Sequence, residues 1–284
     1  MKATVIVPLL AQRDEYLTKC LTSAAEQSAS TEVVVVESAQ TPEGNREVVR
    51  RLIEKYPAMR FIQRPRSGFA AGLNAGIRAA STTRIGFLMS DDWLEPRAVE
   101  TCLDRGADIV STSMTIYDES GAHALHSRRK AQAQYDQLAT DDERAGYLGH
   151  FLLFRREAVV NAGGVDESIG HVGPDDFDLV WTMLERGASV KIVEDGLYCL
   201  RDHRGTRLTL RPVREMRRDF ALILDKHGMT GARREKMMKD HSRWFGRTLQ
   251  EVIARPSQRT RGLPGAKRSS RGPGPWRPDG QMGK

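Results

Sequence analysis

The first third of the chain alternates between short apolar runs and stretches in which apolar side chains recur every three or four positions. The runs are rich in β-branched residues and have strand length: 4–8, 32–37, 60–64 and 84–89. The periodic stretches predict helices at 14–27, 43–55 and 68–80. Apolar strands that alternate with helices form a parallel sheet covered on both faces. We therefore expect an α/β fold whose ligands bind beyond the carboxyl ends of the strands.

The second half of the chain has a weaker pattern. Strands are predicted at 108–117, 149–156, 189–193 and 197–202, and helices at 157–161 and 175–186. Residues 119–143 are polar with few apolar positions, which predicts a loop or a mobile flap. Residues 211–254 contain two basic amphipathic helical stretches, separated near Gly228. The last segment, 255–284, is rich in Pro, Gly, Lys and Arg, so we expect it to be disordered.

This pattern divides the chain into a body at 1–210, a basic helical extension at 211–254 and a disordered basic tail at 255–284. A length of 284 residues, with 39% hydrophobic and 29% charged residues, suits one α/β domain with an appendage, or two small domains. The net charge of +7 is unevenly divided, because residues 1–200 carry −7 and the remainder +14. The basic end either contacts an anionic partner or is solvated surface.

The cysteines and the first residues of the chain indicate the cellular compartment in which the protein works. Cys20, Cys102 and Cys199 fit neither a metal-ligand spacing nor a disulfide framework, which indicates buried thiols in a reducing compartment. The apolar run at the start is too short for a signal peptide or a membrane span, so we interpret it as the first strand. We therefore expect a cytoplasmic protein without a transmembrane segment.

Two adjacent carboxylates follow the fourth predicted strand. Asp91 and Asp92 lie where a parallel sheet holds its ligands, and strand alternation sends their side chains in different directions. One of them can bind Mn²⁺ or Mg²⁺, whose other ligands would be water and phosphate oxygens. The same residues also suit a turn and a helix cap before Pro96. The SDD motif alone leaves both interpretations open.

Five segments together resemble inverting family 2 glycosyltransferases of the GT-A fold, which has a Rossmann-like, mostly parallel sheet flanked by helices. They are TVIVPLLAQRDEYLTKCLTS, EVVVVESAQTP, GFAAGLNAGIRAA, the SDD motif and NAGGVDESIGHVGPDDFDLVWTMLERG. The resemblance covers residues 3–205, apart from 119–143. It implies metal-dependent transfer of a sugar from a nucleotide diphosphate donor to an acceptor hydroxyl, with inversion.

The resemblance also implies donor contacts. Glu37 would touch the nucleoside, although the family usually has Asp there; a carboxylate at a strand end can bind a ribose. Asp91 would contact the ribose or the water around the ion, and Asp92 would bind Mn²⁺ or Mg²⁺. Further donor contacts are expected from five residues: Pro8, Arg66, Gly68, Asn74 and Arg204. The competing interpretations are a local structural bond for Asn74 and surface charge for Arg66.

Histidines and arginines after the last core strand add to this expected site. His203 stands where many family members have a histidine, and it would complete the metal site or contact the diphosphate. Without the resemblance, it reads as a polar surface residue. Arg204 and Arg207 are suited to clamp a phosphate. His150 and His171 fall in segments that line the sugar or acceptor side in relatives.

Asp175 and Asp176 open a predicted helix and match the family's acidic pair, whose second member is the general base. Direct displacement at the anomeric carbon needs a group that takes the proton of the acceptor hydroxyl, and a carboxylate can do so. The metal then offsets the charge that develops on the leaving diphosphate. N-capping of the helix is the competing interpretation, and it is compatible with catalysis.

Other classes of protein fit parts of the sequence. A non-catalytic nucleotide-sugar-binding protein of the same fold is the main alternative, because Glu37 and Asp175 depart from the usual residues. The basic end suggests nucleic-acid binding, but Trp276 is the only aromatic residue of the tail. A nucleotidyltransferase would carry a Gly-rich basic loop after the first strand, and PLLAQRDEY is not one. The acceptor can be a glycan, a lipid-linked sugar or a protein.

Overall fold

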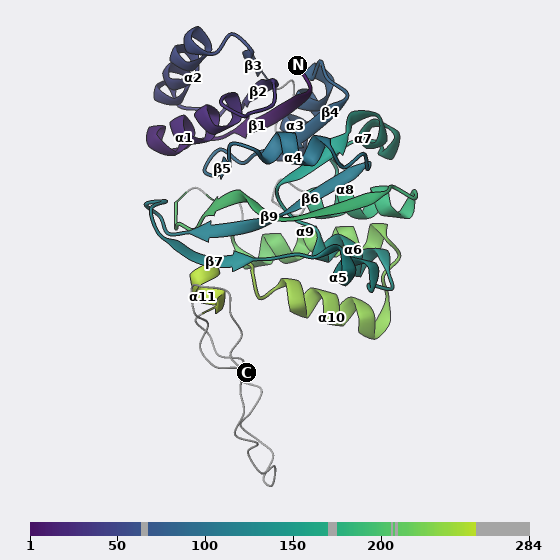
Figure 1. Cartoon of the computed structure of the whole chain (residues 1–284). Coiled ribbons are helices and arrows are strands. Elements are labelled where there is room, and N and C mark those ends of the chain that lie inside the picture. Colours follow the sequence, from purple (N-terminus) through teal and green to yellow (C-terminus); the bar gives the residue numbers. More distant parts are fainter. Residues whose placement is uncertain (64–67, 170–174, 206, 208–209, 254–284) are drawn as a thin grey trace, which may run out of the picture.

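The computed structural model describes residues 1–63, 68–169, 175–205, 207 and 210–253, which form an α/β structure around one nine-stranded sheet (Figure 1). The α/β architecture predicted from the sequence is confirmed. The strands of the sheet are β1 (Ala3–Leu9), β2 (Thr31–Glu37), β3 (Met59–Gln63), β4 (Arg84–Phe87), β5 (Trp93–Leu94), β6 (Ile109–Tyr117), β7 (Ala124–Arg128), β8 (Leu152–Arg155) and β9 (Val190–Arg201).

The sheet has a parallel half and a mixed half. Its order is β3-β2-β1-β4-β8-β6-β9-β5, with β7 paired to β6. The first four strands in this order are parallel, as predicted. From β8 onward antiparallel pairs enter, although β6 and β9 are parallel. The carboxyl ends of β1 and β4 therefore lie side by side, which places the residues after them at one edge.

Helices cover both faces of the sheet, because successive residues of its central strands point to opposite sides. Ile6 of β1 and Val34 of β2 belong to one apolar cluster, whereas Val5, Val7 and Val33 belong to the other. The first cluster is covered by α3 (Phe69–Ala79), α5 (Gln132–Asp136), α6 (Asp141–Tyr147), α7 (Arg156–Ala162), α8 (Asp175–Glu185) and α9 (Val213–Lys226). The second is covered by α1 (Asp14–Ala25), α2 (Glu43–Lys55) and α4 (Ala98–Leu103).

The small residues of α3 serve close packing on the sheet. A Cβ atom added to Gly76 would lie 2.3 Å from Cγ2 of Ile6, so only glycine lets the helix approach β1 this closely. Gly68, which precedes α3, has a φ of 111°, a conformation that favours glycine. Gly76 therefore serves the packing of α3 on β1.

Two predictions for the second half are corrected by the structure. Residues 119–143, expected to be a loop or flap, contain β7, α5 and the beginning of α6. The two strands expected at 189–202 are one strand, β9. The pairing of β9 with β6 jumps from Val193 to Gly196, so the polar residues between them form a bulge within a continuous strand.

The C-terminal extension packs on the body of the protein. The two predicted helices are present as α9 and α10 (Gly231–His241), and a short α11 (Leu249–Ile253) follows (Figure 1). Phe220 and Ile223 of α9 are fully buried in the same cluster as Ile6. The tail at 255–284 lies outside the described residues, and the boundary at 210 stays a prediction. Within the described part of the chain, no helix is long and apolar enough to cross a membrane.

Candidate functional site

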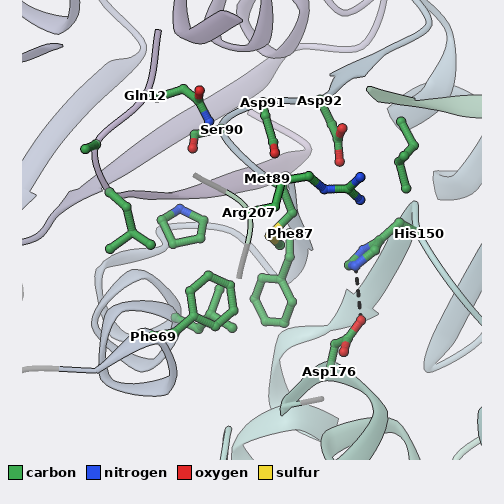
Figure 2. A pocket seen from close by; sticks show the side chains of 15 residues that line it. Gln12, Phe69, Phe87, Met89, Ser90, Asp91, Asp92, His150, Asp176 and Arg207 are labelled. Carbon is green, nitrogen blue, oxygen red and sulfur yellow. Dashed lines mark ion pairs between the residues drawn. The ribbon is translucent and has the colours of Figure 1, made fainter. Parts of the chain in front are cut away.

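A cavity of about 170 Å³ opens at the carboxyl ends of β1 and β4. Part of the wall is apolar and is formed by the end of β1, the residues after it and α3, including Pro8, Leu10 and Phe69. The rest of the wall carries charged and polar side chains: Gln12, Ser90, Asp91, Asp92, His150, Asp176 and Arg207 (Figure 2). The position agrees with the rule that open α/β sheets bind ligands beyond the carboxyl ends of their strands.

Asp91 and His203 form a close pair at this cavity. Nε2 of His203 lies 3.0 Å from Oδ2 of Asp91. The backbone N–H of Gly205 donates to Nδ1 of the same ring at 3.0 Å, which leaves the ring proton on Nε2, facing the carboxylate. The two residues are 112 positions apart. They meet because the end of β9 runs back beside the segment that follows β4.

Asp92 lines the same cavity but is more deeply buried, and its carboxylate is held by two hydrogen bonds. Its Oδ2 accepts a hydrogen bond from the hydroxyl of Tyr198 at 2.5 Å, and its Oδ1 accepts one from the backbone N–H of Arg201 at 2.7 Å. Burial, together with the charge of Asp91, raises the pKa of Asp92 to about 7 despite these two bonds. The two aspartates therefore have different partners, His203 for Asp91 and β9 for Asp92, and the different directions expected for their side chains stay a prediction.

The two expected roles suit the structure better when they are exchanged. Each oxygen of Asp92 accepts a hydrogen bond from β9, which leaves this carboxylate less free for an ion than Asp91, and its role as the metal ligand stays a prediction. Asp91 faces the cavity beside His203, and a carboxylate with an imidazole nitrogen suits Mn²⁺ better than Mg²⁺. Ligation through Nε2 would move the ring proton to Nδ1 and break the Gly205 bond.

The side chains near Asp91 also limit how many metal ligands the protein can provide. Among the described residues there is no group of three or more His, Cys, Asp or Glu side chains that could hold a metal ion. Asp91 and His203 would thus give at most two ligands. Oxygens of a diphosphate and water would provide the others, as is usual for Mg²⁺ and Mn²⁺ in phosphate-binding sites.

Asp176 and His150 form a second pair on another side of the cavity (Figure 2). Nε2 of His150 lies 3.0 Å from Oδ2 of Asp176, which is the second residue of α8. Burial acts to raise the pKa of Asp176, but the hydrogen bond and charge of His150 outweigh it and hold this pKa below its ordinary value. Asp176 is therefore ionised at neutral pH.

A buried lysine fixes the segment that carries His150. The ammonium group of Lys130 donates to Oγ of Ser111 at 3.0 Å, to the carbonyl of Thr112 at 2.7 Å and to the carbonyl of Gly149 at 3.0 Å. These three bonds use all the donors of the lysine and connect β6 to the residue before His150. Burial lowers the pKa of Lys130 to about 7, and the nearby charge of Arg128 adds to this effect.

The two arginines expected to clamp phosphate have different surroundings. Arg207 lines the cavity, where its guanidinium lies on the side of Asp91 and Asp92 in Figure 2, and it donates to buried Asp202 at 2.8 Å. Arg204 instead forms an exposed ion pair with Glu251 of α11. Arg207 is therefore the better placed of the two to meet a diphosphate.

Several other predicted donor contacts lie elsewhere or are not described. Asn74 donates to the carbonyl of Val165 at 2.8 Å and accepts from its N–H at 2.9 Å, which supports the structural interpretation of this residue. Glu37 pairs with Arg46 of α2 and is not among the described residues that line the cavity. Of the five expected donor contacts, Pro8 lines the cavity. Gly68 precedes α3, and its contact with a donor stays a prediction.

Some of the predicted site residues belong to segments that the structure does not describe. Arg66 and His171 lie outside the described residues, and of Asp175 only the backbone, at the start of α8, is described. Sequence reasoning missed the placement of Phe69 and Gln12 in the cavity wall, and the roles of Tyr198 and Lys130. The one signal for Phe69 was its position at the start of a helix beside the expected site.

Comparison with known proteins gives a consistent result. The model of the family described as "Glycosyl transferase family 2" matches residues 4–161, which is more than half of the chain. The chain is similar to the chondroitin synthase of Pasteurella multocida (strain Pm70), with 28% identity over 177 residues, 61% of this chain and 18% of that protein. It is also similar to the uncharacterized glycosyltransferase EpsJ of Bacillus subtilis (strain 168), with 24% identity over 70% of this chain and 61% of that protein.

Two solved structures share the fold. TarS 1–349 of S. aureus in complex with UDP-GlcNAc has a TM-score of 0.60 and 17% identity, over 86% of this chain and 72% of that one. The mannosyltransferase PcManGT of Pyrobaculum calidifontis in complex with GDP-Man and Mn²⁺ has a TM-score of 0.59 and 20% identity, over 86% of this chain and 69% of that one. The GT-A arrangement expected from the sequence is thereby confirmed.

Proposed function

The chain belongs to glycosyl transferase family 2, and from this premise we propose that it transfers a sugar from a nucleotide diphosphate donor to an acceptor hydroxyl. The observation that carries the proposal is one cavity whose wall contains Asp91, backed by buried His203, and the pair of Asp176 with His150. One pair suits the diphosphate side of the donor, and the other suits the removal of a proton. A group-transfer enzyme needs both functions.

The donor would lie along the cavity from the apolar part of its wall to the charged part. Pro8, Leu10 and Phe69 offer apolar surface to a nucleobase, and Gln12 adds a polar group beside it. Arg207 would contact the diphosphate through its fork of N–H donors, which matches phosphate oxygens. A divalent ion bound by Asp91 and His203 would offset the charge of the leaving diphosphate.

Asp176 would act as the general base. It is ionised at neutral pH because His150 lowers its pKa, and it faces the cavity. In a single displacement with inversion, the acceptor oxygen attacks the anomeric carbon as the bond to the diphosphate breaks, and Asp176 takes the hydroxyl proton. His150 holds the carboxylate in position through its Nε2. Backbone N–H groups at the start of α8 add to the stabilisation of the charged carboxylate.

Calorimetry with nucleotides and with nucleotide sugars tests this proposal. We expect UDP or GDP to bind the full chain more tightly with Mn²⁺ than with EDTA, because two protein ligands alone leave the ion to be shared with the diphosphate. The bound nucleotide sugar should then release its nucleotide diphosphate when an acceptor is added. If no nucleotide diphosphate binds with either additive, the donor site is wrong. If the donor binds but no nucleotide is released with a broad acceptor panel, the chain is a binding protein.

A further inference from the structure

Arg201, the last residue of β9, is a buried arginine that binds the segment carrying both aspartates of the site. It is 2% exposed, and it is not among the described residues that line the cavity. Its backbone N–H donates to Oδ1 of Asp92 at 2.7 Å, and Nε of its guanidinium donates to the backbone carbonyl of Asp91 at 3.1 Å. Arg201 therefore holds the side chain of one aspartate and the main chain of the other.

The turn at 118–123, between β6 and β7, fixes the guanidinium of Arg201 from the other side. Nη1 of Arg201 donates to the carbonyl of Glu119 at 2.8 Å. A Cβ atom added to Gly121 would lie 2.7 Å from the same Nη1, so the turn lies directly against the guanidinium. The hydroxyl of Tyr16 also donates to the Glu119 carbonyl, at 3.2 Å, which ties the turn to α1. The guanidinium is thus held between this turn and the main chain of the site.

Aromatic rings hold the same guanidinium in its plane. Its central carbon lies 4.0 Å from the ring centroid of Tyr16 and 5.0 Å from that of Trp93. A cation is attracted to the face of an aromatic ring, and the attraction is stronger where water is excluded. The ring of Tyr16 also contacts His203 edge-on, with 5.3 Å between the ring centroids. Tyr16 therefore packs against both Arg201 and the imidazole that faces Asp91.

We propose that Arg201 is a positioning residue for the metal site, which fixes Asp91 and Asp92 relative to each other without touching the ion or the donor. This inference rests on the proposed function, because it places the ion at these aspartates. It does not depend on which of the two binds the ion, since Arg201 holds both. The loss of an outer residue that orients a metal ligand typically lowers metal affinity about 10- to 100-fold.

The contacts of Arg201 need the shape of an arginine as well as its charge. Nε and Nη1 donate in different directions from one planar group, to Asp91 and to Glu119, while the plane lies against the ring of Tyr16. A lysine at this position would keep the positive charge and the backbone N–H that binds Asp92. It would lose the planar group and the donor at Nε. Arg201→Lys therefore tests the geometry of the contacts separately from their charge.

Calorimetry of the full chain with UDP or GDP, in Mn²⁺ and in EDTA, tests the inference. Arg201→Lys should reduce the gain in nucleotide affinity from Mn²⁺ by about tenfold or more, and it should leave the affinity in EDTA near the wild-type value. Arg84→Lys is the matched control. Arg84 lies at the start of β4, the strand that leads to Asp91, is half-buried, and also donates to a backbone carbonyl, that of Ala107. Arg84→Lys should keep the wild-type gain.

Gly121→Ala and Gly106→Ala form a second pair of variants, which decides the question if Arg201→Lys does not fold. Both glycines have a φ of 70°, so alanine strains the backbone equally at each position. A Cβ atom at Gly121 meets the guanidinium of Arg201, whereas no described atom beyond the chain neighbours lies within 4 Å of one at Gly106. Gly121→Ala should therefore reduce the gain from Mn²⁺, and Gly106→Ala should retain it.

Two outcomes would overturn the role of Arg201 and leave the proposed function intact. In the first, Arg201→Lys keeps the wild-type gain from Mn²⁺, or Gly121→Ala keeps it where Arg201→Lys does not fold. In the second, Arg201→Lys and Arg84→Lys lose the gain equally, which would make Arg201 a structural residue only. Wild type tests the premise separately. If it binds no UDP or GDP, the proposed function fails together with the inference, and if it binds them equally in Mn²⁺ and EDTA, the ion and the role of Arg201 fail together.

Discussion

Asp91 with His203 and Asp176 with His150 are the same chemical pair, each with an N–O distance of 3.0 Å, and the carboxylates of both pairs line one cavity. They differ in exposure. The side chains of His203 and Asp91 are 1% and 13% exposed, and those of His150 and Asp176 are 17% and 30% exposed. Nδ1 of His203 accepts a bond from Gly205, whereas buried Nδ1 of His150 has no hydrogen-bond partner within the described part of the chain.

The same carboxylate–imidazole pair can therefore suit different functions, and the burial and hydrogen bonds around it decide which one. The inner pair, Asp91 with His203, is the more buried of the two, as suits a site that must hold an ion in one place. The outer pair, Asp176 with His150, leaves its carboxylate accessible to a substrate, as suits a group that must take up a proton. Changes to each pair should therefore affect different measured quantities, and the following predictions separate them.

The largest effect is expected at the outer pair. Asp176→Asn should lower sugar transfer by about 10²- to 10⁴-fold, because asparagine cannot take the proton of the acceptor hydroxyl. Asparagine can still cap α8, so the fold should survive. Nucleotide affinity should change by less than about tenfold, roughly 1.4 kcal/mol. Transfer rates and calorimetry would measure the two quantities. Transfer at the wild-type rate would mean that Asp176 is only a cap.

Asp175→Asn is the matched control for this change, since Asp175 is the neighbouring carboxylate at the start of α8. It should transfer sugar faster than Asp176→Asn does. If Asp175→Asn is the inactive variant, the base is the first member of the pair, and the role given to His150 is wrong as well.

The next largest effect is expected at the inner pair. Asp91→Asn should reduce the gain in nucleotide affinity from Mn²⁺ by about 10- to 100-fold, a range typical of damage to a metal site. Asp92→Asn should retain that gain, because both oxygens of Asp92 already accept hydrogen bonds, from Tyr198 and Arg201. Calorimetry with Mn²⁺ and with EDTA measures both. If Asp92→Asn loses the gain and Asp91→Asn keeps it, the exchange of roles is wrong.

A smaller effect is expected for the arginines near the inner pair. Arg207→Ala should weaken binding of the nucleotide diphosphate about tenfold, through loss of a charged contact in the cavity. Arg204→Ala should change it little, because Arg204 is exposed and paired with Glu251. Binding of UDP or GDP by the two variants would compare them directly. Equal losses would show that both arginines reach the phosphates.

The smallest effect is expected at Lys130, which holds the segment carrying His150. It should change how the free energy of unfolding depends on pH. Because burial lowers the pKa of Lys130 to about 7, the folded chain binds fewer protons than the unfolded chain between about pH 7 and pH 10. Wild type should therefore gain stability as pH rises through this window, by up to about 1.4 kcal/mol per pH unit from this residue. Lys130→Met should lack that gain. Urea unfolding at several pH values measures the slope.

Exposed Lys239→Met is the control for Lys130→Met, and it should keep the wild-type slope. Equal slopes for wild type, Lys130→Met and Lys239→Met would mean that Lys130 is charged over the whole range. The three bonds from its ammonium group would then offset its burial.

The sequence predicted the parallel half of the sheet well, because its strands are continuous apolar runs separated by periodic helices. It also predicted that Asp91 and Asp92 point in different directions. It could not say which of them β9 holds, because Tyr198, which binds Asp92, is 106 residues away. The segment 119–143 was misjudged for a similar reason. Lys130 counts as a polar residue in any sequence pattern, yet it is buried against β6.

The packing of α9 on the first apolar cluster has a consequence for biosynthesis. Ile6 and Phe87 leave the ribosome early, but Phe220, Leu224 and Phe245, which complete their cluster, are made more than a hundred residues later. At about 5–20 residues per second, that face would lack the cover of α9 for roughly 7 to 27 seconds after Phe87 is made, although α5 to α8 are made in the meantime. During this time it presents apolar surface to chaperones and to other nascent chains. Slowing translation between residues 87 and 220 should therefore increase aggregation of the newly made chain.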